Sequence, residues 1–135
     1  MNLKDFIRSI QDYPKKGILF RDITTLIKDK DAFTEAINQI VERSKKYNFD
    51  KIAAIESRGF VFASAVSFIL KKPFIMLRKK NKLPAEVHSV DFELEYGTAT
   101  IEVHKDSIEK NDNVLIIDDL IATGGTAEAL SLIHI

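Results

Sequence analysis

The pattern of hydrophobic and polar positions changes its period along the chain. Residues 2–11 carry apolar side chains at helical spacing and predict a short amphipathic helix. Residues 12–24 (DYPKKGILFRDIT) contain Pro14 and Gly17, and predict an irregular loop or a short extended segment. A stronger helix is predicted from Asp31, which we expect to be its N-cap. One face of this helix is formed by Phe33, Ile37, Ile40, Val41 and Ser44.

After residue 50 the pattern becomes that of an α/β protein. Short apolar runs at 51–57 (KIAAIES), 73–77 (PFIML) and 114–118 (VLIID) predict strands, and residues 59–71 (GFVFASAVSFILK) predict an apolar helix. Continuous apolar strands separated by helix-length segments are typical of a parallel sheet covered on both faces. Residues 90–103 (VDFELEYGTATIEV) alternate with a period of two instead. That alternation predicts an antiparallel hairpin that turns near Gly97.

Composition narrows the class of protein. The chain has 135 residues, which favours one domain, and its 20 Lys and Arg balance its 20 Asp and Glu. This balance gives no sign of a nucleic-acid or membrane surface. The absence of cysteine excludes disulfides and thiolate metal sites. The charged N-terminal segment lacks the apolar run of a signal peptide, so we expect a cytoplasmic location.

The segment 114–126 (VLIIDDLIATGGT) holds the most informative chemistry. Two carboxylates, Asp118 and Asp119, fall at a strand's carboxyl end, where open α/β sheets bind ligands. The glycine-rich turn behind them would present bare N–H groups at a helix N-terminus, an arrangement that suits a phosphate. A ligand that satisfies both carries hydroxyls and a phosphate, as a ribose 5-phosphate does. A strand, an acidic turn and a helix cap would be the structural alternative.

This segment resembles the phosphoribosyl pyrophosphate motif of type I phosphoribosyltransferases. The segments YPKKGILFRDIT, IESRGFVFA, RKKNKLP and LEYGTATIEVHKDSI are similar to those of the family's adenine-using members and occur in the same order over residues 3–129. The resemblance implies an α/β type I phosphoribosyltransferase fold: a Rossmann-like parallel sheet flanked by helices, an N-terminal hood segment and an antiparallel flexible-loop hairpin. It also implies one domain over 1–129, with a base-binding hood and the N-terminal helix in 1–30 and the core in 31–129.

The resemblance implies a role for each candidate residue. The adenine site would be Leu19, Phe20 and Arg21. The ribose 5-phosphate site would be Asp118, Asp119, Ala122, Thr123, Gly124, Gly125 and Thr126. Pyrophosphate would be bound by Glu56, Ser57, Arg58, Arg78, Lys79, Lys82 and Tyr96. Arg58 and Glu95 would be the catalytic residues, with Glu95 handling the imidazole proton of the purine. A cis peptide is expected between Glu56 and Ser57.

Each of these residues also has a structural interpretation when it is taken alone. Arg58 could form a salt bridge, Phe20 could be a core residue, Glu95 could be a surface carboxylate, and residues 78–82 (RKKNK) could be a solvated loop. Two other functions also stay open. One is a phosphoribosyltransferase for another purine, such as xanthine or hypoxanthine. The other is a regulator that senses phosphoribosyl pyrophosphate without chemistry.

The resemblance implies adenine and phosphoribosyl pyrophosphate as substrates, with Mg²⁺ bound to the substrate rather than to a protein cage. It also implies a homodimer, because Arg78 in the family reaches the neighbouring subunit's site. Residues 130–135 (LSLIHI) stop where a helix and a further strand would be expected. We hypothesise that they are a non-native tail, that the last helix and strand or strands are missing, and that this chain is poorly active.

Overall fold

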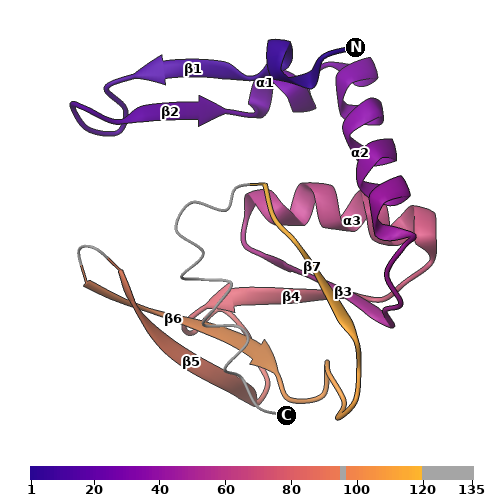
Figure 1. Cartoon of the computed structure of the whole chain (residues 1–135). Coiled ribbons are helices and arrows are strands. Elements are labelled where there is room, and N and C mark those ends of the chain that lie inside the picture. The colour runs from indigo at the N-terminus through magenta and orange to yellow at the C-terminus, as the bar shows by residue number, and fades with distance from the viewer. Residues whose placement is uncertain (95–96, 120–135) are drawn as a thin grey trace. The chain divides into compact units, whose positions relative to one another are not determined.

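The computed structural model describes residues 1–94 and 97–119 (Figure 1). The chain divides into two compact units, Met1–Lys46 and Tyr47–Ile135. Each unit has its own sheet, and each is described by itself. The division into a hood over 1–30 and a core over 31–129 stays a prediction.

The first unit consists of a hairpin and helices (Figure 1). A 3-10 helix, η1 (Leu3–Phe6), precedes the strands β1 (Arg8–Gln11) and β2 (Leu19–Asp22), which pair antiparallel. The helices α1 (Thr24–Ile27) and α2 (Lys30–Ser44) follow. The predicted extended segment within 12–24 is therefore the strand β2.

The prediction of a helix over residues 2–11 is wrong beyond its first turn. Residues 8–11 form β1 instead, with Ile10 facing Phe20 across the hairpin. Asp12 has a positive φ of 58°, and a cis Tyr13–Pro14 peptide lies within the connection that leads to β2. Pairing with β2 supplies hydrogen-bond partners for the backbone of β1, and a four-residue strand is too short for its own pattern to reveal this pairing.

The N-cap of helix α2 lies two residues before the predicted one. Asp29 has extended backbone, and its Oδ1 accepts hydrogen bonds from the N–H groups of Asp31 and Ala32 at 3.0 and 2.9 Å. Asp29 is therefore the N-cap, and Asp31 lies in the first turn, where its charge complements the helix dipole. The predicted apolar face is confirmed at Ile37 and Val41, which are buried.

The second unit is a five-stranded mixed sheet (Figure 1). Its elements are β3 (Lys51–Ile55), α3 (Arg58–Leu70), β4 (Phe74–Lys79), β5 (Val87–Leu94), β6 (Gly97–His104) and β7 (Val114–Ile117). The strand order is β5-β6-β4-β3-β7. Strands β4, β3 and β7 are parallel, as the apolar runs predicted, and β5 and β6 form the predicted antiparallel hairpin.

Helix α3 covers one face of this sheet, and an apolar cluster forms on the other. The Phe60 ring on α3 meets Phe74 of β4 edge to face, with 5.6 Å between ring centroids. Val66 in the middle of the helix is completely buried. The cluster on the other face consists of Ala53, Ile75, Leu77, Ile101 and Val103. Among the described residues, no helix is long and apolar enough to cross a membrane.

Asp22 provides a test of how the first unit is held together. Its carboxylate accepts hydrogen bonds from the hydroxyl and the N–H of Thr24 at 2.6 and 2.9 Å and from Arg8. These hydrogen bonds lower the pKa of Asp22 from 3.8 to about 2, against the opposing effect of burial. A lowered pKa contributes stability above the unfolded value, and this contribution is lost as the pH falls toward 2.

We therefore expect Asp22→Asn to lower the urea midpoint of unfolding at pH 7, and expect the difference from the parent chain to narrow as the pH falls below 4. Asp106→Asn is the control, because Asp106 is exposed. A difference that stayed constant from pH 7 to pH 3 would contradict the assigned role of the Asp22 charge.

Candidate active site

The candidate site forms where two parallel strands end side by side. Strands β3 and β7 are neighbours, and Ala54 lies opposite Ile117 in their register. Glu56 and Ser57 therefore leave the sheet next to Asp118. This position was predicted for the acidic pair, and the register confirms it. Carboxyl ends of parallel strands are where open α/β sheets bind ligands.

Arg58 links the two strand ends electrostatically. Its Nε lies 3.0 Å from Asp119 Oδ2, and the Asp119 side chain is only 6% exposed. Asp119 also donates its backbone N–H to Asp118 Oδ1 at 2.8 Å. A cation from the first turn of α3 is thus paired with a carboxylate that follows β7. The salt-bridge interpretation of Arg58 is confirmed, and this pairing leaves its predicted role at the substrate untested.

Gly59 allows this close approach. A Cβ at Gly59 would lie 3.1 Å from Asp118 Oδ1 and 3.2 Å from the Ile117 carbonyl oxygen. Both distances are shorter than ordinary van der Waals contacts. A Cβ at residue 59 would require Asp118 and the Ile117 carbonyl group to shift by a few tenths of an ångström, so glycine favours this close approach of α3 to β7. The Ser57 side chain makes no capping hydrogen bond to α3. Helix N-termini of this kind favour anions.

Asp118 is held in an unfavourable environment for a charge. Burial raises its pKa from 3.8 to about 6, and the neighbouring Asp119 carboxyl adds to the rise. The Asp119 N–H and the charge of Arg58 oppose it. Perturbed carboxyl groups of this kind are concentrated in functional sites.

Glu56 follows β3 and contacts the basic segment, which we define as residues 78–82 (RKKNK). The peptide bond between Glu56 and Ser57 is cis, as expected. Glu56 Oε1 accepts a hydrogen bond from the Lys79 N–H at 2.5 Å, and Oε2 lies 3.3 Å from Arg78 Nη2. Burial raises the pKa of Glu56, but these two donors outweigh it and hold that pKa below its usual 4.5.

The basic segment, residues 78–82, is partly strand and partly loop. Arg78 and Lys79 are the last residues of β4 and pair with Glu102 and Ile101 of β6. Within the part of the chain that the structure describes, Arg78 Nε is a buried donor without a hydrogen-bond partner. Its Nη1 makes a long bond of 3.4 Å to the Lys82 carbonyl oxygen. The contacts that the Arg78 side chain makes with Lys82 and Glu56 are therefore both long.

The three predicted adenine-site residues lie together on β2 of the first unit. The ring of Phe20 meets Tyr13 edge to face at 5.1 Å between centroids, and Leu19 is 44% exposed. Arg21 donates from Nη1 to Ser9 Oγ at 2.5 Å. Because the sheet has two strands, one edge of β2 has no strand partner within the described residues. Every second backbone group of β2 therefore points away from β1.

Several predicted site residues lie outside the described residues. These are Glu95, Tyr96, Ala122, Thr123, Gly124, Gly125 and Thr126. The sequence analysis did not identify Glu102 as a candidate. Its place between Ile101 and Val103 in the alternating strand is typical of a solvent-facing residue, yet Glu102 is only 7% exposed. The sequence pattern did not indicate that both faces of β6 are covered at this point.

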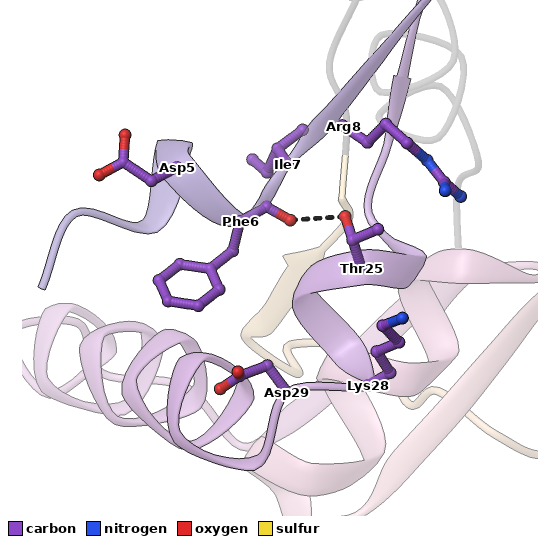
Figure 2. A pocket seen from close by; sticks show the side chains of 7 residues that line it. All are labelled: Asp5, Phe6, Ile7, Arg8, Thr25, Lys28 and Asp29. Atoms are coloured by element: carbon purple, nitrogen blue, oxygen red, sulfur yellow. Dashed lines mark hydrogen bonds between the residues drawn. The ribbon is translucent and has the colours of Figure 1, made fainter.

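The first unit contains a separate pocket of about 420 Å³ (Figure 2). It is lined by Asp5, Phe6, Ile7, Arg8, Thr25, Lys28 and Asp29. Figure 2 shows the Thr25 hydroxyl donating to the Phe6 carbonyl oxygen, at 2.6 Å. None of the predicted site residues lines this pocket. Two of its charges already have structural partners, since Arg8 pairs with Asp22 and Asp29 caps α2.

Comparison with known proteins places this geometry in a family. The model of the phosphoribosyl transferase domain matches residues 23–134. A similar adenine phosphoribosyltransferase of Pelagibacter ubique is 88% identical over 129 residues, which are 96% of this chain and 74% of that protein. The crystal structure of the adenine phosphoribosyltransferase of Thermoanaerobacter pseudethanolicus has a TM-score of 0.93 and 46% identity, covering 97% of this chain and 76% of that one.

A third similar protein was crystallised with ligands. The Saccharomyces cerevisiae enzyme, in complex with adenine and an imino-altritol bisphosphate, has a TM-score of 0.89 and 34% identity. The match covers 97% of this chain and 77% of that one. The chain therefore belongs to the phosphoribosyltransferase family and has the type I phosphoribosyltransferase fold. Within that family it belongs with the adenine phosphoribosyltransferases of purine salvage.

The raised pKa of Asp118 leads to a prediction about stability. Between pH 4 and 6 the folded chain keeps a proton on Asp118 that the unfolded chain has released, so stability falls as the pH rises through this window. Asp118→Asn removes the charge and keeps an oxygen that accepts the Asp119 N–H. We expect the variant to have a higher urea midpoint of unfolding than the parent at pH 7.5, with the difference vanishing near pH 4.

The exposed Asp106→Asn is the control for this measurement, and we expect it to leave the midpoint unchanged at both pH values. An Asp118→Asn chain that was less stable than the parent at pH 7.5 would show that the carboxylate is favourably placed, contrary to the prediction.

Proposed function

We propose that the chain catalyses the transfer of a 5-phosphoribosyl group from phosphoribosyl pyrophosphate to adenine, giving AMP and pyrophosphate. The bond between ribose C1 and the pyrophosphate oxygen breaks, a bond from the adenine imidazole nitrogen to C1 forms, and the imidazole proton leaves the base. One observation carries the proposal: the N-terminus of α3 and an acidic pair meet at neighbouring strand ends, linked by the 3.0 Å pair of Arg58 and Asp119.

Asp118 and Asp119 are proposed to hold the ribose hydroxyls. Their carboxyl oxygens accept hydrogen bonds and place negative charge near C1 as it becomes cationic in the transition state. Ala122 and the turn Thr123–Thr126 are proposed to bind the 5-phosphate through backbone N–H groups. Anchoring the phosphate would fix C1 below the base, so that binding energy remote from C1 lowers the entropic cost of reaction.

Pyrophosphate is proposed to lie between the start of α3 and the basic segment. Ser57 and Arg58 would contribute the helix N-terminus and a guanidinium, and Lys79 and Lys82 would add charge. Arg78 is proposed to reach the pyrophosphate site of the partner subunit, because its present contacts are long and its buried Nε has no partner among the described residues.

Magnesium is proposed to enter as part of the substrate, where it neutralises the charge of the leaving pyrophosphate. Among the described residues, no group of three or more acidic or histidine side chains could hold a metal ion. Mg²⁺ commonly keeps several waters and takes substrate phosphate oxygens together with one or two carboxylates. A substrate-borne ion fits that preference.

Adenine is proposed to bind at β2. The Phe20 ring offers an aromatic surface for stacking, and the backbone groups of Leu19 and Arg21 would read the edge of the base. An edge strand suits this role, since within residues 1–94 and 97–119 no strand lies opposite the hydrogen-bonding groups on the open side of β2. A site that hydrogen-bonds the amino group of adenine would reject bases that carry an oxygen there.

Glu95 and Tyr96 come between β5 and β6 in the sequence and lie outside the described residues. We propose that Glu95 accepts the imidazole proton of adenine, that Tyr96 contacts pyrophosphate and that this segment closes over the bound substrates. Closure would exclude water that could hydrolyse the activated ribose.

We also propose a cytoplasmic homodimer in which Arg78 serves the partner's site.

The function is tested by measuring pyrophosphate release from phosphoribosyl pyrophosphate with adenine, hypoxanthine or xanthine as the acceptor. We expect release with adenine and at least 10²-fold less with the two 6-oxopurines. Because the hypothesis of a non-native tail predicts low activity, the assay includes a chimera in which the remaining C-terminal sequence of the Pelagibacter ubique relative replaces residues 130–135. Equal release with hypoxanthine would favour the alternative purine, and substrate binding without release in both proteins would favour the sensor.

The role of Glu95 is tested by Glu95→Gln in the same chimera. Loss of a general base costs roughly 10²-fold or more, so we expect kcat to fall by that order while the affinity for phosphoribosyl pyrophosphate stays unchanged. Glu86→Gln, an exposed change just before β5, is the matched control. Full turnover by Glu95→Gln would remove this assignment.

A further inference from the structure

Glu102 is a buried carboxyl group whose hydrogen bonds reach two other segments. It lies in the middle of β6 and is 7% exposed. Its Oε1 accepts from the Asn81 N–H at 2.9 Å, and its Oε2 accepts from Ser89 Oγ at 3.1 Å. Burying a carboxyl group is costly unless its oxygens are hydrogen-bonded, so these two contacts are the ones that make the position tolerable.

The Asn81 contact holds the basic segment in an unusual turn. Asn81 has a φ of +67°, in the left-handed region that few residues other than glycine and asparagine adopt readily. Its N–H points to Glu102, and the Lys82 N–H turns back to the Lys79 carbonyl oxygen at 3.3 Å. The Glu102 carboxyl group therefore fixes the point at which the chain reverses after β4.

A second carboxylate holds the other end of the same segment. Glu56, which follows β3, accepts the Lys79 N–H at 2.5 Å. Glu56 and Glu102 thus accept hydrogen bonds from backbone N–H groups two residues apart. The segment Arg78–Lys82 is therefore held through its backbone at Lys79 and Asn81, and Glu56 also lies 3.3 Å from Arg78 Nη2.

The Ser89 contact ties this arrangement to the hairpin.

We propose that Glu102 is a positioning residue for pyrophosphate: through Asn81 and Ser89 it sets the place of the basic segment Arg78–Lys82 relative to the β5–β6 hairpin. This inference rests on the proposed function, because it takes the basic segment as the pyrophosphate site. Glu102 itself contacts no substrate. Its effect is to hold the backbone between Lys79 and Lys82 in place beside the hairpin.

The test uses Glu102→Leu, Glu102→Gln and Ser89→Ala. Leucine fills the buried position without an acceptor, so the fold should persist while the Asn81 N–H loses its partner. Glutamine can keep both contacts, since its oxygen accepts from Asn81 and its NH₂ group donates to Ser89 Oγ. The exposed Glu86→Leu is the matched control.

Three quantities are measured on the chain: the Kd of magnesium pyrophosphate by calorimetry, the hydrogen exchange rate of the Asn81 amide by NMR, and the urea midpoint. For Glu102→Leu we expect the Kd to rise roughly tenfold and Asn81 exchange to accelerate by a similar factor. Ser89→Ala should raise the Kd by a smaller factor. Glu102→Gln should restore both quantities to within about threefold of the parent, and the control should change neither.

The outcomes separate the inference from the proposed function. If the parent chain binds pyrophosphate and Glu102→Leu leaves the Kd and Asn81 exchange unchanged, the inference is wrong and the proposed function stands. A Kd that rises equally in Glu102→Leu and Glu102→Gln would assign the effect to charge and would also overturn positioning. If the parent binds no pyrophosphate, the assignment of the basic segment falls, and the inference falls with it.

Discussion

The parallel pairing of β3 with β7 is the constraint on which the candidate site depends. It sets Ala54 opposite Ile117, so the chain leaves both strands at the same edge of the sheet. Two segments about sixty residues apart in sequence thereby bring Arg58 and Asp119 within 3.0 Å. A shift of one residue in register would turn every side chain of β7 to the opposite face and separate this pair. The proposed chemistry therefore depends on the backbone hydrogen bonds that pair β3 with β7.

The site carries a cost in stability that its geometry explains. Burial raises the pKa of Asp118 to about 6, which means that its charge is held in an unfavourable place at neutral pH. Gly59 gives up a side chain, and with it helix propensity, to let α3 lie against β7. Proteins retain destabilising residues at positions where function needs preorganised charge or a close approach of the backbone. Both costs lie at the strand ends, where the ligand is proposed to bind, and not in the apolar cluster around Ile75.

The sequence predicted the elements whose pattern is long or chemically specific. The apolar runs gave the parallel strands, the period-two segment gave the hairpin, and the cis peptide at Glu56 followed from the family resemblance. The prediction of a helix over 2–11 was wrong because β1 forms by pairing with β2, and the pattern of four residues alone does not indicate that pairing. Glu102 was missed for a related reason: alternation shows which face a residue occupies, but only the tertiary structure shows whether that face is covered.

The arrangement of Glu56 and Glu102 shows how a basic segment can be kept ready for an anion. Side chains of lysine and arginine lose much conformational freedom when they are fixed, so ordering them directly by salt bridges would be costly and would occupy their charges. Here the backbone is fixed instead, through the N–H groups of Lys79 and Asn81. Backbone N–H donors carry no formal charge, and binding them to carboxyl oxygens leaves the ammonium groups to the ligand. Glu56 and the buried Glu102 therefore order the segment through its backbone, and among the described residues neither forms an ion pair with Lys79 or Lys82.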